Sequence, residues 1–313
     1  MQNIVISVEK SLTILIKKLI YIAGPTGIGK TSLSILIAKH LKTEILSCDS
    51  RQFYKEMSIG TGVPSIDEQQ GIKHHFIHNK SIHKLYDAYK FEKEGLILLK
   101  KLFKKHDKVV MVGGSGLYAK ALMKGLDKIP KVDLKSIKSV KEIYKKKGLK
   151  GLQLELKERD PIYYKTVDLK NQRRLIRALE VCKSTQKPYS SFLKKSNGVR
   201  FFKSKTLLLK MNRERLYNRI NHRVDKMISL GLIEEAKSLF LYKELGALQT
   251  VGYRELFEHF EGKKDIKETI ELIKKNTRNY AKRQLTWFNK IESISVETDK
   301  LNQTVSQIIE KLN

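Results

Sequence analysis

The sequence predicts an α/β protein with a parallel sheet at its core and an inserted domain made of helices. Three observations lead to this fold class. A glycine-rich loop joins a strand pattern to a helix pattern near the N-terminus, strand and helix patterns alternate over the first 129 residues, and only helix patterns occur over 130–198. Alternating strands and helices are typical of a parallel sheet, because parallel strands need a crossover between them.

The glycine-rich loop matches a phosphate-binding pattern. Residues 24–31 are Gly-Pro-Thr-Gly-Ile-Gly-Lys-Thr, which fits G-x-x-x-x-G-K-[ST] at every fixed position. The apolar run 19–23 before it is a predicted strand, and helical spacing follows over 32–41. Backbone N–H groups of such a P-loop point at a phosphate, its lysine adds a positive charge, and its threonine hydroxyl can hold Mg²⁺. The residues expected to bind a diphosphate or triphosphate are Gly24, Pro25, Thr26, Gly27, Ile28, Gly29, Lys30 and Thr31, with Thr31 at the metal.

The other predicted elements divide the chain into a core and an insertion. Besides 19–23, strands are expected at 44–48, 108–112 and 206–210. The expected helices of the core are 32–41, 88–105, 117–124, 213–230, 233–240, 253–261 and 266–288, and those of the insertion are 134–147, 149–158, 161–166 and 171–184. We therefore expect a core of residues 1–129 and 199–313 and a helical insertion of residues 130–198.

The charge of the chain points to a polyanionic partner. Its 313 residues include 63 Lys and Arg but 33 Asp and Glu, a net charge of +30. Because 50 of the 63 are lysines, A/T-rich codon usage is an alternative explanation of this total. The distribution favours binding, since residues 131–198 carry 19 basic and 7 acidic residues and contain the cluster Arg173, Arg174 and Arg177. Arginine suits bidentate contacts with phosphate, so the insertion is expected to bind nucleic acid.

The sequence carries the features of a cytoplasmic protein. It contains no run of about 18 apolar residues, so we expect no membrane span. Residues 1–18 lack the apolar stretch and cleavage site of a signal peptide and are expected to be a short extension without an assigned role. Cys48 and Cys182 are expected to be reduced residues of the hydrophobic core.

Two polar residues lie where strands of the predicted sheet end, which is where an open parallel sheet binds its ligands. Asp49 follows the second strand, and it either binds Mg²⁺ through water, accepts a proton, or opens an Asx turn. Ser115 follows the third strand in a glycine-rich turn, and it either contacts a phosphate or caps the next helix. Residues 79–82 lack the aspartate of a guanine-binding N-K-x-D element, and no four apolar residues precede Asp-Glu. A GTPase switch and a motor ATPase are therefore disfavoured.

Six blocks of sequence, in this order, resemble the tRNA dimethylallyltransferase family, whose members prenylate the adenosine immediately 3′ of the anticodon. The blocks are GPTGIGKT (24–31), DSRQFYK with MSIGT (49–55 and 57–61), VGGSGLY (112–118), RLIRALEV (174–181), TVGYRE (250–255) and YAKRQLTWF (280–288). Each later block alone is a weak signal. Six blocks in the family's order are specific, and they cover the chain from residue 19 to about 290.

The resemblance implies a P-loop nucleotide-kinase-like core whose loop holds dimethylallyl diphosphate and Mg²⁺ rather than ATP. It implies that Lys30 stabilises the departing diphosphate, that Asp49 takes a proton from the adenine N6 amine, and that Ser115 lies near the amine or the diphosphate. The residues that it implies contact the tRNA anticodon stem-loop are Asp49, Ser50, Arg51 and Gln52, together with Arg173, Arg174, Leu175, Ile176 and Arg177.

The sequence departs from the family pattern at three positions. Ser115 replaces the usual threonine but keeps a hydroxyl. Asn171-Gln172-Arg173-Arg174 replaces the familiar Asn-Pro-Gln-Arg, so an arginine stands at 173 in place of glutamine. Ile137 stands where the family has an arginine, and we expect the neighbouring Lys138 to replace it in tRNA binding.

Three alternatives share part of the pattern. A small-molecule or nucleotide kinase has the same P-loop, and an adenylate isopentenyltransferase performs the same chemistry on a free nucleotide. The basic insertion disfavours both, because a small acceptor needs no basic clamp. A non-catalytic RNA-binding protein is disfavoured by Asp49 beside an intact P-loop. We therefore expect a monomeric cytoplasmic prenyltransferase that acts on tRNA.

Overall fold

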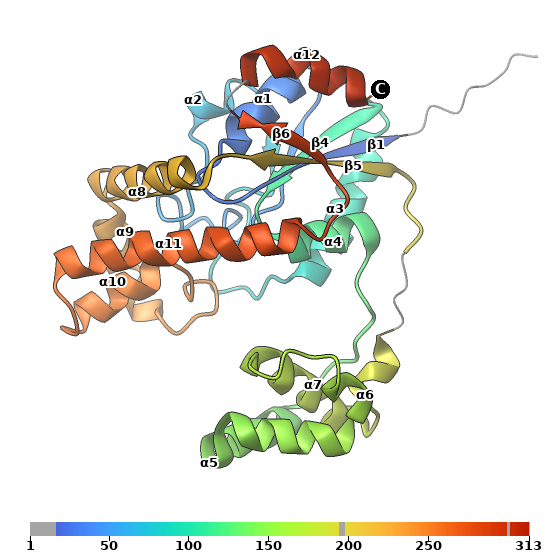
Figure 1. Ribbon diagram of the computed structural model, residues 1–313, viewed down its shortest axis with the longest axis vertical. Coiled ribbons are helices and arrows are strands. Elements are labelled where there is room, and N and C mark those ends of the chain that lie inside the picture. The colour runs from blue at the N-terminus through green and yellow to red at the C-terminus, as the bar shows by residue number, and fades with distance from the viewer. Residues whose placement is uncertain (1–16, 194–197, 299–300, 313) are drawn as a thin grey trace, which may run out of the picture. The chain divides into compact units, whose positions relative to one another are not determined.

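The computed structural model describes residues 17–193, 198–298 and 301–312. Its centre is a six-stranded sheet in the order β3-β2-β4-β1-β5-β6, and every adjacent pair is parallel (Figure 1). The strands are β1 (Lys18–Ala23), β2 (Ile45–Ser47), β3 (His74–His75), β4 (Lys108–Gly113), β5 (Lys203–Lys210) and β6 (Ile294–Glu297). The predicted α/β fold with a parallel sheet is confirmed.

The central strand β1 is buried on both faces of the sheet. It pairs with β4 on one side and with β5 on the other. Successive side chains of a strand point to opposite faces, so Leu19 and Tyr21 pack into one hydrophobic core and Ile20 and Ile22 into another. Burial on both faces explains why this strand is a continuous apolar run.

Helices cover both faces of the sheet. They are α1 (Lys30–His40), α2 (Ile66–Gln69), α3 (Ala88–Leu102), α4 (Gly116–Lys124), α8 (Arg213–Ser229), α9 (Leu232–Ser238), α10 (Tyr253–Phe260), α11 (Ile266–Phe288) and α12 (Leu301–Leu312), with a short 3₁₀ helix η2 (Phe240–Tyr242). Residues of α3, α4, α9 and α10 share a core with Leu19, whereas residues of α1 and α12 share a core with Ile20. The helices α8 and α11 contribute to both cores.

Residues Lys124–Val199 form a second compact unit with a core of its own. Its helices are α5 (Leu134–Arg159), α6 (Pro161–Tyr164), α7 (Gln172–Thr185) and the 3₁₀ helix η1 (Tyr189–Phe192), and its described residues contain no strand. Val140, Leu152 and Leu179 are fully buried in this core. The periodic apolar residues of α5 and α7 therefore stabilise the unit by packing against each other.

The sequence predicts two helices where the structure has α5, and Gly148 accounts for the difference. Gly148 adopts φ 60° and ψ −154°, a conformation outside the helical region that glycine tolerates best. The predicted break is thus present as a kink, and the helix continues on its other side.

Two strands and two α-helices were not predicted, namely β3, β6, α2 and α12, and neither were the 3₁₀ helices η1 and η2. The first has two residues, and in β6 only Val296 is buried, so neither produces a periodic pattern. The predicted start of β5 was also late, because Lys203 and Ser204 are exposed and give no apolar signal.

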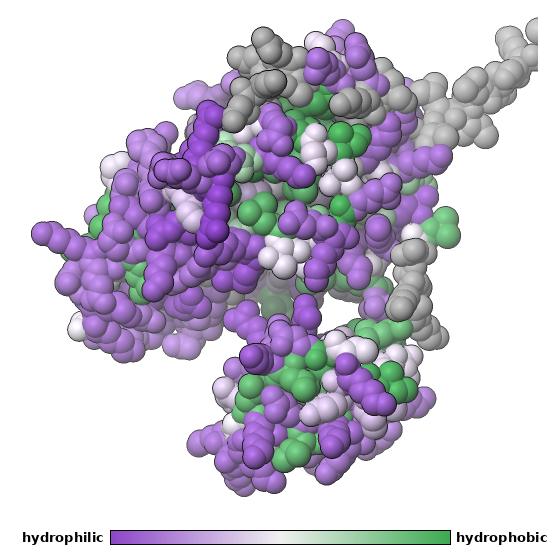
Figure 2. Space-filling view, in the orientation of Figure 1, coloured by the Kyte–Doolittle hydropathy of each residue, from purple (hydrophilic) through white to green (hydrophobic). Residues whose placement is uncertain are grey.

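Residues 1–16 of the predicted extension lie outside the described residues. Hydrophilic side chains dominate the face shown in Figure 2, and none of the described helices is long and apolar enough to span a membrane.

Candidate active site

The P-loop forms a tight turn between β1 and α1. Gly27 (φ 80°) and Gly29 (φ 102°) adopt left-handed conformations that favour glycine. A Cβ on Gly27 would lie 3.0 Å from Cγ1 of Ile220, so the loop packs closely on α8. The Nζ of Lys30 donates a hydrogen bond to Pro25 O across the loop, at 2.8 Å. Gly24 to Gly29 thus form the loop and Lys30 and Thr31 begin α1, where backbone N–H groups favour an anion.

Burial lowers the pKa of Lys30 from 10.5 to about 8. The carboxylate of Asp49 opposes this shift of the pKa, and the guanidinium of Arg223 adds to it. Both side chains are therefore within electrostatic reach of the P-loop lysine. A bound diphosphate would raise the pKa of Lys30 again, because a nearby opposite charge favours the protonated amine.

Asp49 lies just beyond the end of β2. Its Oδ1 accepts a hydrogen bond from Arg51 N–H at 2.9 Å, which is the Asx turn considered as an alternative role. Among the residues that the structure describes, no other group donates a hydrogen bond to this carboxylate. The turn and a proton-accepting role are compatible, because each can use a different carboxylate oxygen.

Ser115 connects the loop after β4 to the loop after β2. Its hydroxyl accepts a hydrogen bond from Ser50 N–H at 2.9 Å and also bonds to the Tyr280 hydroxyl of α11. Burial first, and then the charge of Asp49, raise the pKa of Tyr280 to about 12, so this phenol stays protonated at neutral pH. The backbone carbonyl of Ser115 starts α4 by accepting from Ala119 N–H. The structure thus brings Ser115 and the Asp49 turn together.

Gln284 of α11 connects the P-loop to the loop after β4. Its Oε1 accepts a hydrogen bond from Thr26 N–H and its Nε2 donates one to Gly114 O, both at 2.9 Å. Its side chain is buried, and a Cβ on Gly114 would lie 2.1 Å from its Nε2. The sequence assigned block 280–288 no place in the site, and the structure shows that this block supplies both Tyr280 and Gln284 to it.

Arginines of α8 also belong to this site, and the sequence analysis missed them. Arg223 lies within electrostatic reach of Lys30 and Asp49. Arg219 donates a hydrogen bond from Nε to Gly27 O of the P-loop at 2.9 Å. Arg215, Arg219 and Arg223 recur every four residues, so they lie along one side of α8. This spacing directly after a strand is the signal that could have revealed them.

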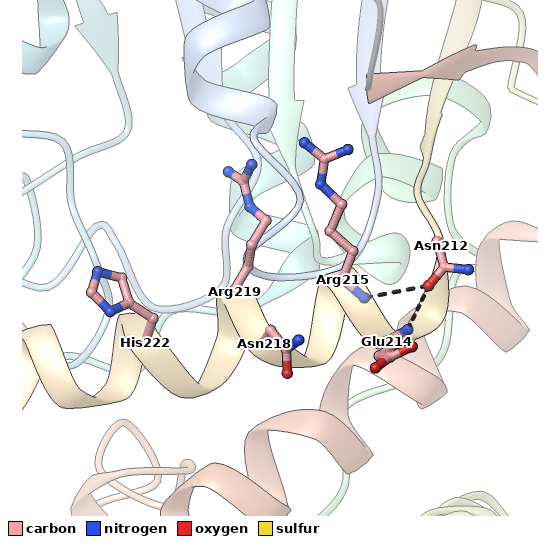
Figure 3. A pocket seen from close by; sticks show the side chains of 6 residues that line it. All are labelled: Asn212, Glu214, Arg215, Asn218, Arg219 and His222. Atoms are coloured by element: carbon pink, nitrogen blue, oxygen red, sulfur yellow. Dashed lines mark hydrogen bonds between the residues drawn. The ribbon is translucent and has the colours of Figure 1, made fainter.

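A hollow of about 460 Å³ lies along the first half of α8 (Figure 3). It is lined by Asn212, Glu214, Arg215, Asn218, Arg219 and His222. Arg215 and Arg219 extend from the same side of the helix, and Asn212 caps the helix by accepting hydrogen bonds from the N–H groups of Glu214 and Arg215. Because Arg219 also bonds to Gly27, this hollow borders the P-loop.

Comparison with known proteins identifies the family. The family model described as IPP transferase matches residues 52–291 of this chain. The chain belongs to the IPP transferase family. Similar proteins include a tRNA dimethylallyltransferase of Christiangramia forsetii, which is 53% identical over 94% of this chain and 98% of that protein. Another, from Flavobacterium johnsoniae, is 48% identical over 95% of this chain and 98% of that protein.

Solved structures of IPP transferases share the fold. The tRNA isopentenylpyrophosphate transferase of Bacillus halodurans aligns with a TM-score of 0.69 at 32% identity, covering 95% of this chain and 97% of that chain. A eukaryotic dimethylallyltransferase acting on tRNA aligns with a TM-score of 0.77 at 27% identity, covering 95% of this chain and 77% of that one. The family prediction made from six sequence blocks is therefore confirmed.

In this IPP transferase, the predicted tRNA-binding residues of the core follow β2 directly. Asp49, Ser50, Arg51 and Gln52 are all partly buried. The amide of Gln52 is engaged at both ends, because its Oε1 accepts from the Ser47 hydroxyl at 2.8 Å and its Nε2 donates to Gly62 O at 3.0 Å. Its side chain therefore supports the local backbone in the free protein.

The remaining predicted tRNA-binding residues lie in the second unit of the IPP transferase. Those with exposed side chains are Arg173, Arg174 and Arg177 on α7 and Lys138 on α5. The side chain of Leu175, which was also predicted to contact tRNA, is fully buried in the core of the unit. Ile176 is partly buried against the same core. Helical periodicity explains the division, since Leu175 and Leu179 face inward while Arg174 and Arg177 face solvent.

Proposed function

We propose that the protein transfers the dimethylallyl group of dimethylallyl diphosphate to N6 of the adenosine immediately 3′ of the anticodon in tRNA, releasing diphosphate. One observation carries the proposal. The P-loop with Lys30, the carboxylate of Asp49 and the hydroxyl of Ser115 lie together at the strand ends of a chain that is about half identical to tRNA dimethylallyltransferases.

The transfer exchanges a carbon–oxygen bond for a carbon–nitrogen bond. The N6 amine attacks C1 of the allyl group, the bond from C1 to the diphosphate oxygen breaks, and a proton leaves the nitrogen. An aromatic amine is a weak nucleophile, so catalysis depends on stabilising the negative charge of the departing diphosphate. The P-loop N–H groups, Lys30 and Arg223 supply positive charge for this, and a pKa of about 8 leaves Lys30 mostly charged at neutral pH.

Asp49 is the proposed acceptor of the proton. Arg51 N–H orients its Oδ1, while its second oxygen has no hydrogen-bond donor among the described residues. A base must lie within hydrogen-bond reach of the proton that it takes, and an oriented carboxylate beside the P-loop meets that requirement for an amine at the allylic carbon. The adjacent Ser115 hydroxyl is placed to contact the amine or a diphosphate oxygen.

The residues of the site fit a magnesium ion. The Thr31 hydroxyl and the Asp49 carboxylate are oxygen ligands of the kind that Mg²⁺ prefers. The described residues contain no cluster of three or more His, Cys, Asp or Glu able to hold a metal. Mg²⁺ would therefore be held by Thr31 together with diphosphate oxygens, and when bound it neutralises charge on the leaving group.

The second unit is proposed to hold the anticodon stem-loop through Lys138 on α5 and the exposed arginines of α7. The N6 amine of a stacked base is inaccessible, so the base must be splayed out of the loop, and a basic clamp can stabilise the RNA in that state. We further propose that the protein acts as a monomer in the cytoplasm, where its tRNA substrates are.

A transfer assay with parallel acceptors tests the proposal. Purified protein is incubated with Mg²⁺, labelled dimethylallyl diphosphate and an unmodified anticodon stem-loop RNA, with AMP and ATP as alternative acceptors. Asp49→Asn is a matched variant, because its amide oxygen can still accept from Arg51 N–H but cannot take a proton. We expect label in the RNA with the native protein, and loss of transfer in a variant that still binds the RNA.

Other outcomes of this assay overturn the proposal. Label in AMP alone would identify an adenylate isopentenyltransferase. Hydrolysis of ATP without prenyl transfer to any acceptor would indicate a kinase-like enzyme. RNA binding without turnover in the native protein would indicate a binding protein.

A further inference from the structure

The carboxylate of Glu235, on α9, binds the backbone of a loop that has no role in the proposed reaction. This loop comprises residues 57–62. Glu235 Oε2 accepts hydrogen bonds from the N–H groups of Ser58 and Ile59 at 2.9 and 2.8 Å. Its Oε1 accepts from Gly60 N–H at 2.9 Å and from the hydroxyl of the buried Tyr253 at 2.6 Å. Three successive N–H groups around one carboxylate form an anion-binding nest, so the charge of Glu235 fixes the path of the loop.

The same loop ends against an arginine of the active site. Gly62 has φ +59°, and a Cβ built on it would lie 1.8 Å from Nη2 of Arg223. The guanidinium therefore packs directly on the backbone of Gly62. From the other side, Gln52 Nε2 donates to Gly62 O at 3.0 Å, which ties this end of the loop to the turn that carries Asp49.

Arg223 depends on this packing for its position. Burial lowers its pKa, and the charges of Asp49 and Glu68 oppose that change. Among the described residues, no carboxylate forms a salt bridge or hydrogen bond with its guanidinium. A long side chain without a bonded partner takes the position that its packing allows. Here the backbone of Gly62 limits where the Arg223 guanidinium can lie.

We propose that Glu235 is a positioning residue of the active site. By fixing the loop 57–62, it keeps Gly62 in the place where Arg223 packs within electrostatic reach of Asp49 and Lys30 and can meet the diphosphate. The inference rests on the proposed function only in naming the diphosphate as that of the prenyl donor.

The test measures binding of inorganic diphosphate with Mg²⁺ by calorimetry, which needs no acceptor and no turnover. The variant is Glu235→Gln. In one orientation its NH₂ group faces the N–H groups of Ser58 and Ile59. In the other orientation it faces Gly60 N–H, while the Tyr253 hydroxyl can turn to accept from it, so at least one backbone N–H of the loop loses its acceptor and the loop must shift. We expect the dissociation constant to rise about tenfold. The matched control is Glu234→Gln, an exposed neighbour on the same helix with the same change in charge, which should leave binding unchanged.

A double-mutant cycle separates positioning from general damage. If Glu235 acts through Arg223, then Glu235→Gln has no further effect on diphosphate binding in an Arg223→Ala protein. Gly62→Ala should weaken binding in the native background, because its methyl group displaces the guanidinium, and should do less in Arg223→Ala. If Glu235→Gln fails to fold, as judged by circular dichroism, Tyr253→Phe removes one of the four hydrogen bonds and should weaken binding about twofold.

Two results would overturn the inference. One is an equal loss of binding from Glu235→Gln in the native and Arg223→Ala backgrounds, which means that the two residues act independently. The other is native diphosphate affinity in folded Glu235→Gln. Failure of the transferase proposal is distinguishable from both, since it leaves the diphosphate measurements intact.

Discussion

Replacing Lys30 by methionine is expected to stabilise the free protein while abolishing its binding of diphosphate. The pKa of Lys30 falls from 10.5 to about 8 on folding, chiefly through burial. Since each tenfold change in proton affinity corresponds to about 1.4 kcal/mol, the buried charge costs the folded state about 3 kcal/mol at neutral pH. Methionine removes this cost and also the hydrogen bond to Pro25 O, which contributes about 1 kcal/mol. The expected net gain is about 2 kcal/mol.

The stability difference between Lys30→Met and the native protein should decrease as the pH rises. Below pH 8 the lysine is charged in both the folded and unfolded states, so the full cost is present. Between pH 8 and 10.5 the folded state releases its proton first, and the cost disappears as the pH rises. The advantage of Lys30→Met should therefore persist at pH 7 and fall close to zero near pH 9.5, because the cost drops by about 2 kcal/mol between these pH values.

Urea unfolding at both pH values measures this difference, and calorimetry with diphosphate and Mg²⁺ measures the loss of binding. Lys39→Met, which removes an exposed charge from the same helix, is the control and should change stability by less than about 0.5 kcal/mol. A Lys30→Met protein less stable than the native one at pH 7, or a difference that does not change with pH, would refute the reasoning.

Three further predictions concern the rest of the site. Gln284→Glu turns a carboxylate oxygen toward Gly114 O in a buried position, so the urea midpoint should fall by an amount equivalent to about 2 kcal/mol, and an unchanged midpoint would contradict the bonding described. Leu175→Ala should destabilise the protein by about 2–5 kcal/mol, because it leaves a cavity in the core of the second unit. The exposed Arg174→Ala should leave the free energy of unfolding unchanged but weaken binding of stem-loop RNA, and the RNA affinity should then depend less steeply on salt. Lys138→Ala should also weaken RNA binding in a filter assay, with exposed Lys157→Ala as the control, and equal affinity in the two variants would exclude Lys138 as the substitute for the arginine missing at Ile137.

Local signals made the P-loop side of the fold predictable. The strand, loop and helix over residues 18–40 are adjacent in sequence, and each carries its own pattern, so their order and chemistry followed directly. Asp49 and Ser115 were found for a related reason, since carboxyl ends of parallel strands meet at one edge of a sheet. Their mutual contact through Ser50 N–H confirms that the two strand ends lie together.

The missed residues of the site come from helices distant in sequence. Arg223 and Gln284 lie far along the chain from the P-loop, and nothing local shows that their helices pack beside it. The arginines at 173, 174 and 177 drew attention in the sequence because they lie within five residues, whereas those of α8 are spread over a longer stretch and become a group only when the helix is folded. Leu175 was included among the predicted tRNA contacts because it lies within the motif, and its side chain is buried.

The hydrogen bond from Thr26 to Gln284 joins residues that are 258 positions apart. A ribosome makes the P-loop long before α11, so the loop is synthesised well before the residue that supports it. A nascent or truncated chain that lacks α11 therefore lacks the contact that fixes Thr26 relative to Gly114. The P-loop therefore gains this support only after α11 has been made and has packed beside it.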